Sequence, residues 1–277
     1  MRLNFYSAVC SLALVLAGCS AGDVDLESRT IDVQQTPQPA SAPLASGMAA
    51  LVAQVGPSYV TLIVSAVSNQ SLAKDKDKDN RSAVTSGSGF IVDDEGYVMT
   101  AAHVAVNSGN SVSARAANGR VYSGTVVNIL PGNDMALIKL RGFRGHAAMP
   151  VANACLMRGA TLFSLGKPHA QSDTARFGTV ETMSFGHPVQ YGKFGYPDAM
   201  VMHMNTQKGE SGGPVFDDKG MLAGMVVSTL SDGNGQPLNQ AHAIPSATLA
   251  SFLCSNISCS ANWSALSQRA GQPCGTN

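Results

Sequence analysis

Short apolar segments, each bounded by Gly, Asn or Asp, are the feature that most constrains the fold of this 277-residue chain. Such segments are long enough for a β-strand but too short for a typical globular helix. Their close spacing predicts an all-β barrel or sandwich. The segments that we expect to form strands are Tyr59–Val67, Gly89–Val92, Tyr97–Ala102, Gly124–Leu130, Ala136–Leu140, Thr161–Leu165, Met200–Met204 and Met221–Val227.

Two helices are expected at the ends of this β-rich region. Met48–Val55 has an amphipathic pattern that stops before Pro57, and Ala247–Phe252 follows Pro245. A third segment, Lys74–Asn80, alternates charges and contains no apolar residue. Its aspartates are similar to the start of a calcium loop, but Asn80 occupies the position that requires Gly. We therefore expect a solvated loop there and no metal site.

The charge balance excludes one class of partner. Lys and Arg together number 18, as do Asp and Glu, so no net field attracts the chain to nucleic acid. Apolar residues make up 44% of the chain and charged residues only 13%, which is enough apolar material for a sizeable core.

The first 19 residues carry a targeting signal. Arg2 precedes the apolar run Ala8–Val15, which is too short to span a bilayer. The run leads into Leu16-Ala17-Gly18-Cys19, which resembles a bacterial lipobox, although an ordinary signal peptide that contains a cysteine is the alternative. The lipobox predicts cleavage before Cys19 and lipidation of its thiol. Ser20 at the next position resembles an outer-membrane sorting signal, so we expect an exported protein anchored by lipid at the cell envelope and facing the periplasm.

Residues 20–46 are expected to form a flexible tether. Thr36–Pro43 contains three prolines and has little apolar surface to bury. A coil of this length would reach roughly 30 Å on average. The folded domain is then expected over residues 47–253, followed by a cysteine-containing tail over residues 254–277.

Four cysteines remain in the mature chain: Cys155, Cys254, Cys259 and Cys274. An even number of cysteines in an oxidising compartment predicts two disulfides, and the sequence leaves all three pairings open. Their spacing fits no common zinc site. We therefore expect no structural metal.

The glycine-rich segment Gly209-Glu210-Ser211-Gly212-Gly213-Pro214 is the strongest local indication of chemistry. A serine hydroxyl becomes a good nucleophile only with a base that takes its proton and a pocket that stabilises an oxyanion. Glycines on both sides of Ser211 allow a sharp turn in which successive amides point into one hole. Gly209 and Ser211 are the expected oxyanion donors.

Two further motifs supply the partners that this nucleophile requires. Thr100-Ala101-Ala102-His103 ends an apolar segment, and Asp134 immediately precedes the apolar segment that starts at Met135. We expect His103 to act as the general base and Asp134 to fix its tautomer. A surface histidine and a strand-capping aspartate would be ordinary in isolation, but the three motifs in this order indicate a Ser-His-Asp triad.

These motifs, with others, resemble the HtrA branch of the trypsin-like serine peptidases over about residues 48–252. The resemblance implies two packed six-stranded β-barrels of chymotrypsin type, about residues 47–147 and 148–253, with a short C-terminal helix. It also implies an active site between the barrels, protein or peptide substrates and no cofactor. The segments that carry it are Ser86–Val92, Gly96–His103, Asp134–Leu137, Gly209–Pro214 and Ala243–Ser246.

The sequence departs from that family in three ways. Only about 25 residues follow the last expected helix, too few for the PDZ domain that HtrA proteins usually carry. No Ile-Val cleavage motif precedes the first strand. Glu210 replaces the Asp or Asn that is common before the nucleophile, and we expect its carboxylate to face water or to pair with a Lys or Arg, Lys208 being the nearest in sequence.

The resemblance also implies a substrate pocket. One wall would be Asn205, Thr206 and Gln207, and another would be the strand that ends at Ser228. Ser228 should also lie near Asp134. The lack of an acidic residue at Asn205 favours a neutral pocket for a small or medium side chain. His203 and His242 could lie nearby and favour an acidic side chain, although such histidines are more often simply packed or exposed.

Two other functions are compatible with parts of the sequence. Gly209–Gly213 also fits the G-x-S-x-G elbow of α/β-hydrolases, with Asp232 and His242 as nominal partners, but the short strands lack the helices of that fold. The second alternative is a catalytically weak, protease-like binding module tethered to the envelope. The sequence favours a serine endopeptidase of exported proteins over both.

Overall fold

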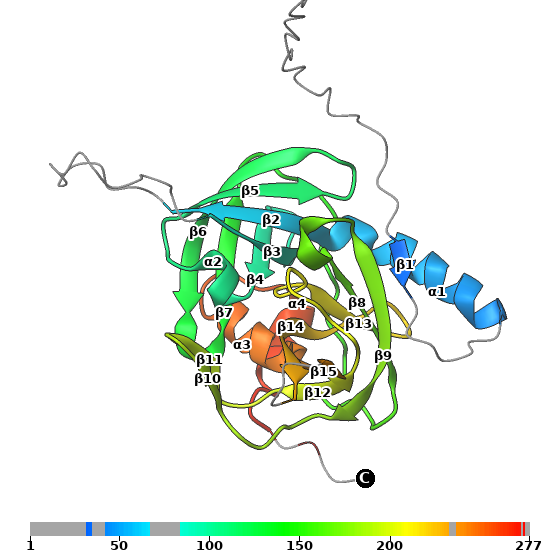
Figure 1. Cartoon of the computed structure of the whole chain (residues 1–277). Coiled ribbons are helices and arrows are strands. Elements are labelled where there is room, and N and C mark those ends of the chain that lie inside the picture. The colour runs from blue at the N-terminus through cyan, green and yellow to red at the C-terminus, as the bar shows by residue number, and fades with distance from the viewer. Residues whose placement is uncertain (1–31, 35–41, 67–83, 233–236, 273, 275–277) are drawn as a thin grey trace, which may run out of the picture.

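The computed structural model describes residues 32–34, 42–66, 84–232, 237–272 and 274. The expected signal peptide with Cys19, most of the expected tether and the charged segment Lys74–Asn80 lie outside the described residues. The described residues form two β-barrels, the first at the top of Figure 1 and the second below it.

Six antiparallel strands close the first barrel in the order β2-β3-β4-β7-β6-β5. Alternate residues of each strand point inward, and β-branched and aliphatic side chains such as Val60, Leu62 and Val98 fill the interior. The strands are β2 (Tyr59–Ser65), β3 (Val84–Ile91), β4 (Tyr97–Thr100), β5 (Ser111–Ala116), β6 (Val121–Leu130) and β7 (Met135–Leu140).

The second barrel closes because β9 pairs with β8 along one edge and with β12 along the other. Its ring order is β8-β9-β12-β15-β14-β13, and all six strands contribute to an interior rich in methionine. The strands are β8 (Thr161–Gly166), β9 (Thr174–Thr182), β12 (Met200–His203), β13 (Pro214–Asp217), β14 (Leu222–Ser231) and β15 (Pro237–Pro245). The two six-stranded barrels confirm the expected fold, and they are not the parallel βα architecture that the α/β-hydrolase alternative requires.

A single hydrophobic core runs from the interior of the first barrel to the outer face of the second. Phe90 and Leu62 belong to it, and so do Phe163 and Phe216 of the second barrel. Because burial of apolar side chains drives packing, the two barrels form one body with their connecting loops gathered at the junction.

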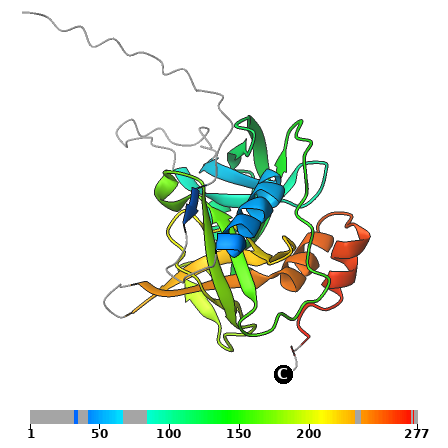
Figure 2. The same cartoon turned by 90° about the vertical axis from the view of Figure 1, so that its right-hand side faces the viewer.

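Helices cover the outside of this body. Helix α1 (Ala42–Val55, blue in Figure 2) packs Val52 and Val55 into the common core, and the late helix α3 (Ser246–Cys254) lies where the sequence predicts it. Helix α1 begins at Ala42, earlier than expected, because proline is tolerated in the first turn of a helix. The expected tether also contributes a short strand, β1 (Asp32–Gln34), which pairs in parallel with the start of β9.

The structure contains several elements that the sequence did not predict. Helix α4 (Ala261–Ser267) forms part of the expected tail and buries Trp263 and Leu266. Strands β10 (Val189–Tyr191) and β11 (Phe194–Tyr196) form a hairpin within the long connection between β9 and β12.

The four cysteines form two disulfides. Cys155 pairs with Cys274, which fastens the end of the described chain to the segment before β8, and Cys254 pairs with Cys259 between α3 and α4. The sequence left this pairing open. Among the described residues no group of His, Cys, Asp and Glu could hold a metal ion, and no helix there is long and apolar enough to cross a membrane.

Candidate active site

The structure brings His103 and Asp134 together at the junction of the barrels. His103 lies on the one-turn helix α2 (Ala102–Ala105), directly after β4, and not at a strand end as expected. Asp134 follows the 3₁₀ turn Pro131–Asn133 in the left-handed region at φ 49°, which aspartate tolerates better than most residues. Its carboxylate is fully buried.

Three hydrogen bonds from two segments hold the Asp134 carboxylate. Oδ1 accepts the backbone amide of His103 at 2.9 Å, and Oδ2 lies 2.8 Å from His103 Nδ1. The hydroxyl of Tyr191 donates to Oδ2 as well. A carboxylate this close to Nδ1 keeps the proton on that nitrogen, which leaves Nε2 free to accept one. The side chain of His103 is 25% exposed, so solvent and a substrate can reach it.

Ser211 belongs to the second barrel but is tied to the first. Its carbonyl accepts the amide of Ser88 from β3 at 2.9 Å, and the Ser88 hydroxyl donates to the Gly209 carbonyl at 2.9 Å. The next residue must be glycine, because Gly212 has φ 81° and a Cβ there would lie 2.3 Å from the carbonyl oxygen of Ser88. Close approach of the two barrels therefore explains the glycine that follows Ser211.

Two amides in the loop around Ser211, those of Gly209 and of Ser211 itself, have no protein acceptor among the described residues. The amides of Glu210, Gly212 and Gly213 donate to backbone carbonyls, whereas within the described residues those of Gly209 and Ser211 donate to none. The Lys208 carbonyl accepts the amide of His169 at 2.7 Å. Because a trans peptide directs its C=O and N–H to opposite sides, the Gly209 amide points away from His169. Two amides are thus available to an oxyanion.

Glu210 does not face water, which excludes the solvated interpretation of this residue. It is 1% exposed, and its Oε1 lies 2.8 Å from Nε of Arg176, a β9 residue that is itself 7% exposed. Its Oε2 accepts the amide of Gln207 at 2.6 Å. The expected pairing with a cation is confirmed, but the partner is Arg176 and not the sequence neighbour Lys208. Burial raises the pKa of Glu210, and the Arg176 guanidinium and the Gln207 amide oppose that shift.

The β10–β11 hairpin reaches across the junction and contacts the His-Asp pair. Tyr191 bonds Asp134, Phe194 lies edge-on to the His103 ring at 6.4 Å, and Lys193 donates to the Val106 carbonyl at 3.1 Å. Burial and the nearby Asp134 carboxylate raise the pKa of Tyr191 well above its usual range, so its hydroxyl stays a donor. Sequence reasoning missed both Arg176 and Tyr191.

The residues expected to form the substrate pocket lie in the loop before Ser211 and on β14. Thr206 is buried and its hydroxyl bonds Thr229 on β14 at 2.8 Å, while Asn205 and Gln207 are half-buried beside it. Ser228 was expected to lie near Asp134. Its hydroxyl bonds Tyr196 at 2.8 Å, and the hydroxyl that bonds Asp134 is that of Tyr191.

The two histidines considered for the pocket have different environments. His203 is exposed and pairs with Glu181 at the surface. His242 is fully buried, its Nδ1 lies 2.8 Å from the Tyr196 hydroxyl, and its Nε2 has no hydrogen-bond partner among the described residues. Burial lowers the pKa of His242, and Asp198 opposes that shift.

The sequence and the fold are similar to those of known peptidases. Residues 87–225, half of the chain, match the family described as a trypsin-like peptidase domain. The serine protease HTR4 of Rattus norvegicus is 31% identical over 74% of this chain and 40% of its own length. The putative serine protease HhoA of Synechocystis is 29% identical over 57% of this chain and 41% of its own, and a probable periplasmic DegP-like endoprotease of Bartonella henselae is 28% identical over 58% and 31%. The chain spans less than half the length of each of these relatives.

Solved structures share the fold. The Rv3671c protease in its inactive form has a TM-score of 0.60 at 24% identity and covers 81% of this chain and 98% of its own. The HtrA-type protease AlgW with a decapeptide has a TM-score of 0.60 at 22% identity and covers 74% and 66%.

Arg176→Met tests whether the buried pair orders the loop. We expect the free energy of unfolding to fall by about 3–5 kcal/mol, because Glu210 is left buried without its cation. The pKa of Glu210 should rise further when that cation is lost. The rate at which a fluorophosphonate labels Ser211 is expected to fall as the pH is lowered. In this variant that fall should begin at a higher pH. Arg176→Met with Glu210→Gln should recover much of the stability, since no buried charge remains.

The matched control is Arg158→Met, which removes an arginine that pairs with Glu181 at the surface and is 77% exposed. Exposed pairs contribute about 0–1 kcal/mol, so this variant should label like the wild type. An unchanged pH profile in a folded Arg176→Met variant would contradict the ordering role.

Tyr191→Phe tests the hydroxyl that donates to Asp134. A hydrogen bond to a charged group is worth about 1.5–3 kcal/mol, so labelling of Ser211 should slow by about tenfold or more in a variant that remains folded and melts a few degrees lower than the wild type. Tyr97→Phe, whose ring contacts the Lys139 ammonium outside the site, is the control and should have no effect. Equal labelling rates in both variants would show that the hairpin only covers the site.

Proposed function

The chain belongs to the trypsin-like peptidase family, and on that basis we propose that it is a serine endopeptidase with the catalytic triad His103, Asp134 and Ser211. The observation that carries the proposal is the buried Asp134 carboxylate 2.8 Å from His103 Nδ1, at the same junction as the glycine-flanked Ser211. Protein and peptide substrates fit this assignment, and AlgW, which shares the fold, has been solved with a decapeptide.

Acylation follows from the positions of these groups. The Ser211 oxygen attacks the carbonyl carbon of the scissile bond while His103 Nε2 takes the hydroxyl proton. Asp134 stabilises the imidazolium that results, and the amides of Gly209 and Ser211 donate to the oxyanion of the tetrahedral intermediate. The intermediate collapses, the C–N bond breaks, and the imidazolium gives its proton to the leaving amine. An acyl-enzyme on Ser211 remains.

Deacylation repeats the sequence with water. His103 takes a proton from the water as its oxygen attacks the acyl carbon, and the same two amides receive the negative charge. When the ester bond breaks, the proton returns to the Ser211 oxygen and the carboxylic product leaves. No step requires a metal or an organic cofactor.

The primary specificity pocket is assigned to Asn205, Thr206, Gln207 and Ser228. Thr206 and Thr229 join two of its walls through their hydroxyls, and Tyr196 and His242 lie behind Ser228. None of these groups carries a fixed charge, which supports a preference for a neutral side chain of small or medium size.

Fluorophosphonate labelling of the full chain tests the triad. We expect the wild type to be labelled and Ser211→Ala to be folded but unlabelled, because the substitution removes only one hydroxyl. Asp134→Asn should lower peptide turnover by about 10⁴, because the amide favours the wrong tautomer of His103. Near-normal turnover of Asp134→Asn at neutral pH would contradict the assignment of that carboxylate.

A protease-like binding module is the alternative outcome. It predicts a folded protein that binds peptides but is not labelled at Ser211 at any pH. The amides of Gly209 and Ser211, which donate to no acceptor among the described residues, favour the enzyme, since a site without turnover has no need to keep donors available.

We also propose that the mature chain is exported and anchored by lipid on Cys19, with the peptidase domain in the periplasm. The order of Arg2, the apolar run and the small residues before Cys19 supports this, as does the periplasmic naming of the Bartonella relative. The natural substrates would then be exported or envelope proteins.

Cys19→Ser tests the anchor. A cysteine that carries a diacylglyceride and an amide-linked chain is held stably at a membrane, whereas a single chain is not. We expect the wild type to partition into the detergent phase and the variant to be uncleaved or to partition into water. Detergent partitioning of a cleaved Cys19→Ser variant would contradict the lipobox.

A further inference from the structure

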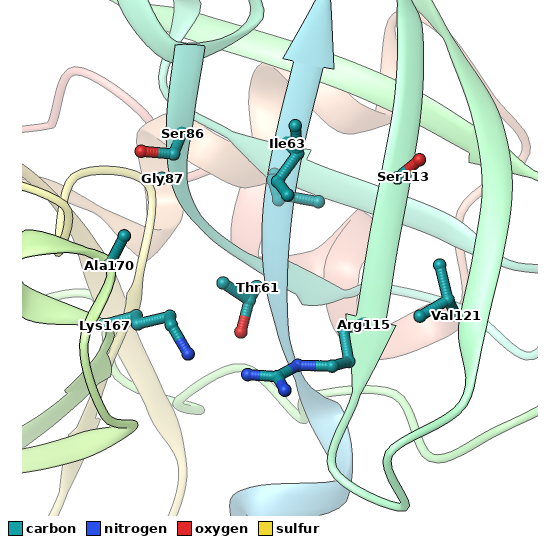
Figure 3. A pocket seen from close by; sticks show the side chains of 10 residues that line it. Thr61, Ile63, Ser86, Gly87, Ser113, Arg115, Val121, Lys167 and Ala170 are labelled. Atoms are coloured by element: carbon teal, nitrogen blue, oxygen red, sulfur yellow. The ribbon is translucent and has the colours of Figure 1, made fainter. Parts of the chain in front are cut away.

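A second pocket lies directly beside the proposed catalytic serine, and neither the family assignment nor the triad accounts for it. It has a volume of about 300 Å³ and opens between the outer face of the first barrel and the loop that follows β8 (Figure 3). The strand register explains its walls. Thr61 stands opposite Arg115, and Ile63 stands opposite both Ser86 and Ser113, so these side chains share the outward face of the barrel.

Two backbone contacts place this pocket next to the reacting groups. Gly87, whose backbone lines the pocket, directly precedes Ser88, which donates its amide to the Ser211 carbonyl at 2.9 Å. A Cβ on Gly209 would lie 2.4 Å from the carbonyl oxygen of Lys167, the lysine on the opposite wall. The pocket therefore adjoins both the nucleophile and one proposed oxyanion amide.

The pocket lies on the side of Ser211 where the leaving group would be. The segment Ser211–Gly212 runs between β14, where Val226 accepts the Gly212 amide, and β3, where Ser88 donates to Ser211. The proposed specificity pocket lies on the β14 side. A substrate that crosses Ser211 from that side continues over β3, so the residues after the scissile bond meet the second pocket.

Two cations converge in it. Figure 3 shows the Lys167 ammonium and the Arg115 guanidinium extending toward each other from opposite walls, below Thr61. Burial and the Arg115 charge lower the pKa of Lys167, and the Asp173 carboxylate opposes that shift. Among the described residues neither cation makes an ion pair or a hydrogen bond.

One buried carboxylate acts on this pair. Asp173 is 6% exposed and accepts the hydroxyl of Thr61 at 3.2 Å, and it affects Lys167 more strongly than Arg115 does. Counted over these three described side chains, the formal charge is still positive. Ile63, which is 50% exposed, and Val121 add an apolar surface that suits the aliphatic stem of a side chain.

We propose that this pocket, lined by Arg115 and Lys167, binds a carboxylate that the substrate carries on the leaving-group side of the scissile bond. The inference rests on the proposed peptidase function, since the substrate's direction across Ser211 follows from it. The carboxylate comes either from an acidic side chain one or two residues after the cleaved bond or from the C-terminus of a short substrate. An anion there relieves the repulsion between the two cations and forms charge-assisted hydrogen bonds with both.

Matched peptides test the subsite with the full-length chain in detergent. A library of internally quenched peptides carries Glu or Gln at each of the first two positions after the scissile bond. A second library ends at those positions in a free acid or an amide. We expect kcat/KM to be at least tenfold higher for the carboxylate member of the preferred pair. A preference in the first library identifies a side chain as the ligand, and a preference only in the second identifies the chain end.

Arg115→Gln and Lys167→Gln should each reduce that ratio severalfold, and the double variant should bring it to about one. Arg120→Gln is the control, because Arg120 lies on the same barrel against Tyr122 and outside the pocket. A ratio near one in the wild type, or a ratio that survives the double variant, overturns the proposal.

Binding separates this inference from the proposed activity. Fluorescence anisotropy of the same Glu and Gln peptides on Ser211→Ala needs no turnover. Tighter binding of the Glu member that depends on Arg115 and Lys167 supports the subsite even if no peptide is cleaved. Equal binding of both members, with Ser211 of the wild type labelled by fluorophosphonate, overturns the subsite and leaves the peptidase function intact.

Discussion

The contact between Ser88 and the loop before Ser211 is the interaction on which the rest of the site depends. The Ser88 amide donates to the Ser211 carbonyl, and its hydroxyl donates to the Gly209 carbonyl. These bonds join a strand of the first barrel to the Gly209–Gly213 loop of the second. They require two backbones to approach closely, which explains why Gly212 leaves no room for a side chain there. His103 and Ser211 come from different barrels, so this contact fixes where one stands relative to the other.

The same junction holds two carboxylates that are stabilised differently. Asp134 receives hydrogen bonds from an amide, an imidazole and a phenol, and no Lys or Arg of the described segments pairs with it, so its charge remains available to an imidazolium. Glu210 is paired with Arg176 and accepts the Gln207 amide, so its charge is already neutralised. The first arrangement suits a group that responds to charge developing on His103. The second suits a group that only shapes the loop.

The sequence predicts the triad because each member lies in a local motif whose glycines, strand ends or turn residues can be recognised without the fold. The same local signals predict most strands and the helix after Pro245. Arg176 is different, because its role is set by a partner 34 residues away and its strand lacks clear apolar alternation. Tyr191 lies 57 residues from Asp134, in a hairpin whose short strands bury few side chains. One signal could have led to Arg176: an acid beside Ser211 that lacks an N-terminal ammonium partner can be buried only if a cation elsewhere in the chain pairs with it.

The loop and strand from Lys167 to Arg176 connect the two cationic features of the site. Lys167 at its start faces a pocket with unbalanced positive charge, whereas Arg176 at its end is neutralised by Glu210. The His169 amide between them holds the Lys208 carbonyl and so directs the Gly209 amide away from His169. An anion bound at Lys167 would restrain the backbone that orients this amide. On the proposed assignment, a cation within the same barrel and one short loop order the oxyanion hole, and neither requires a newly cleaved N-terminus.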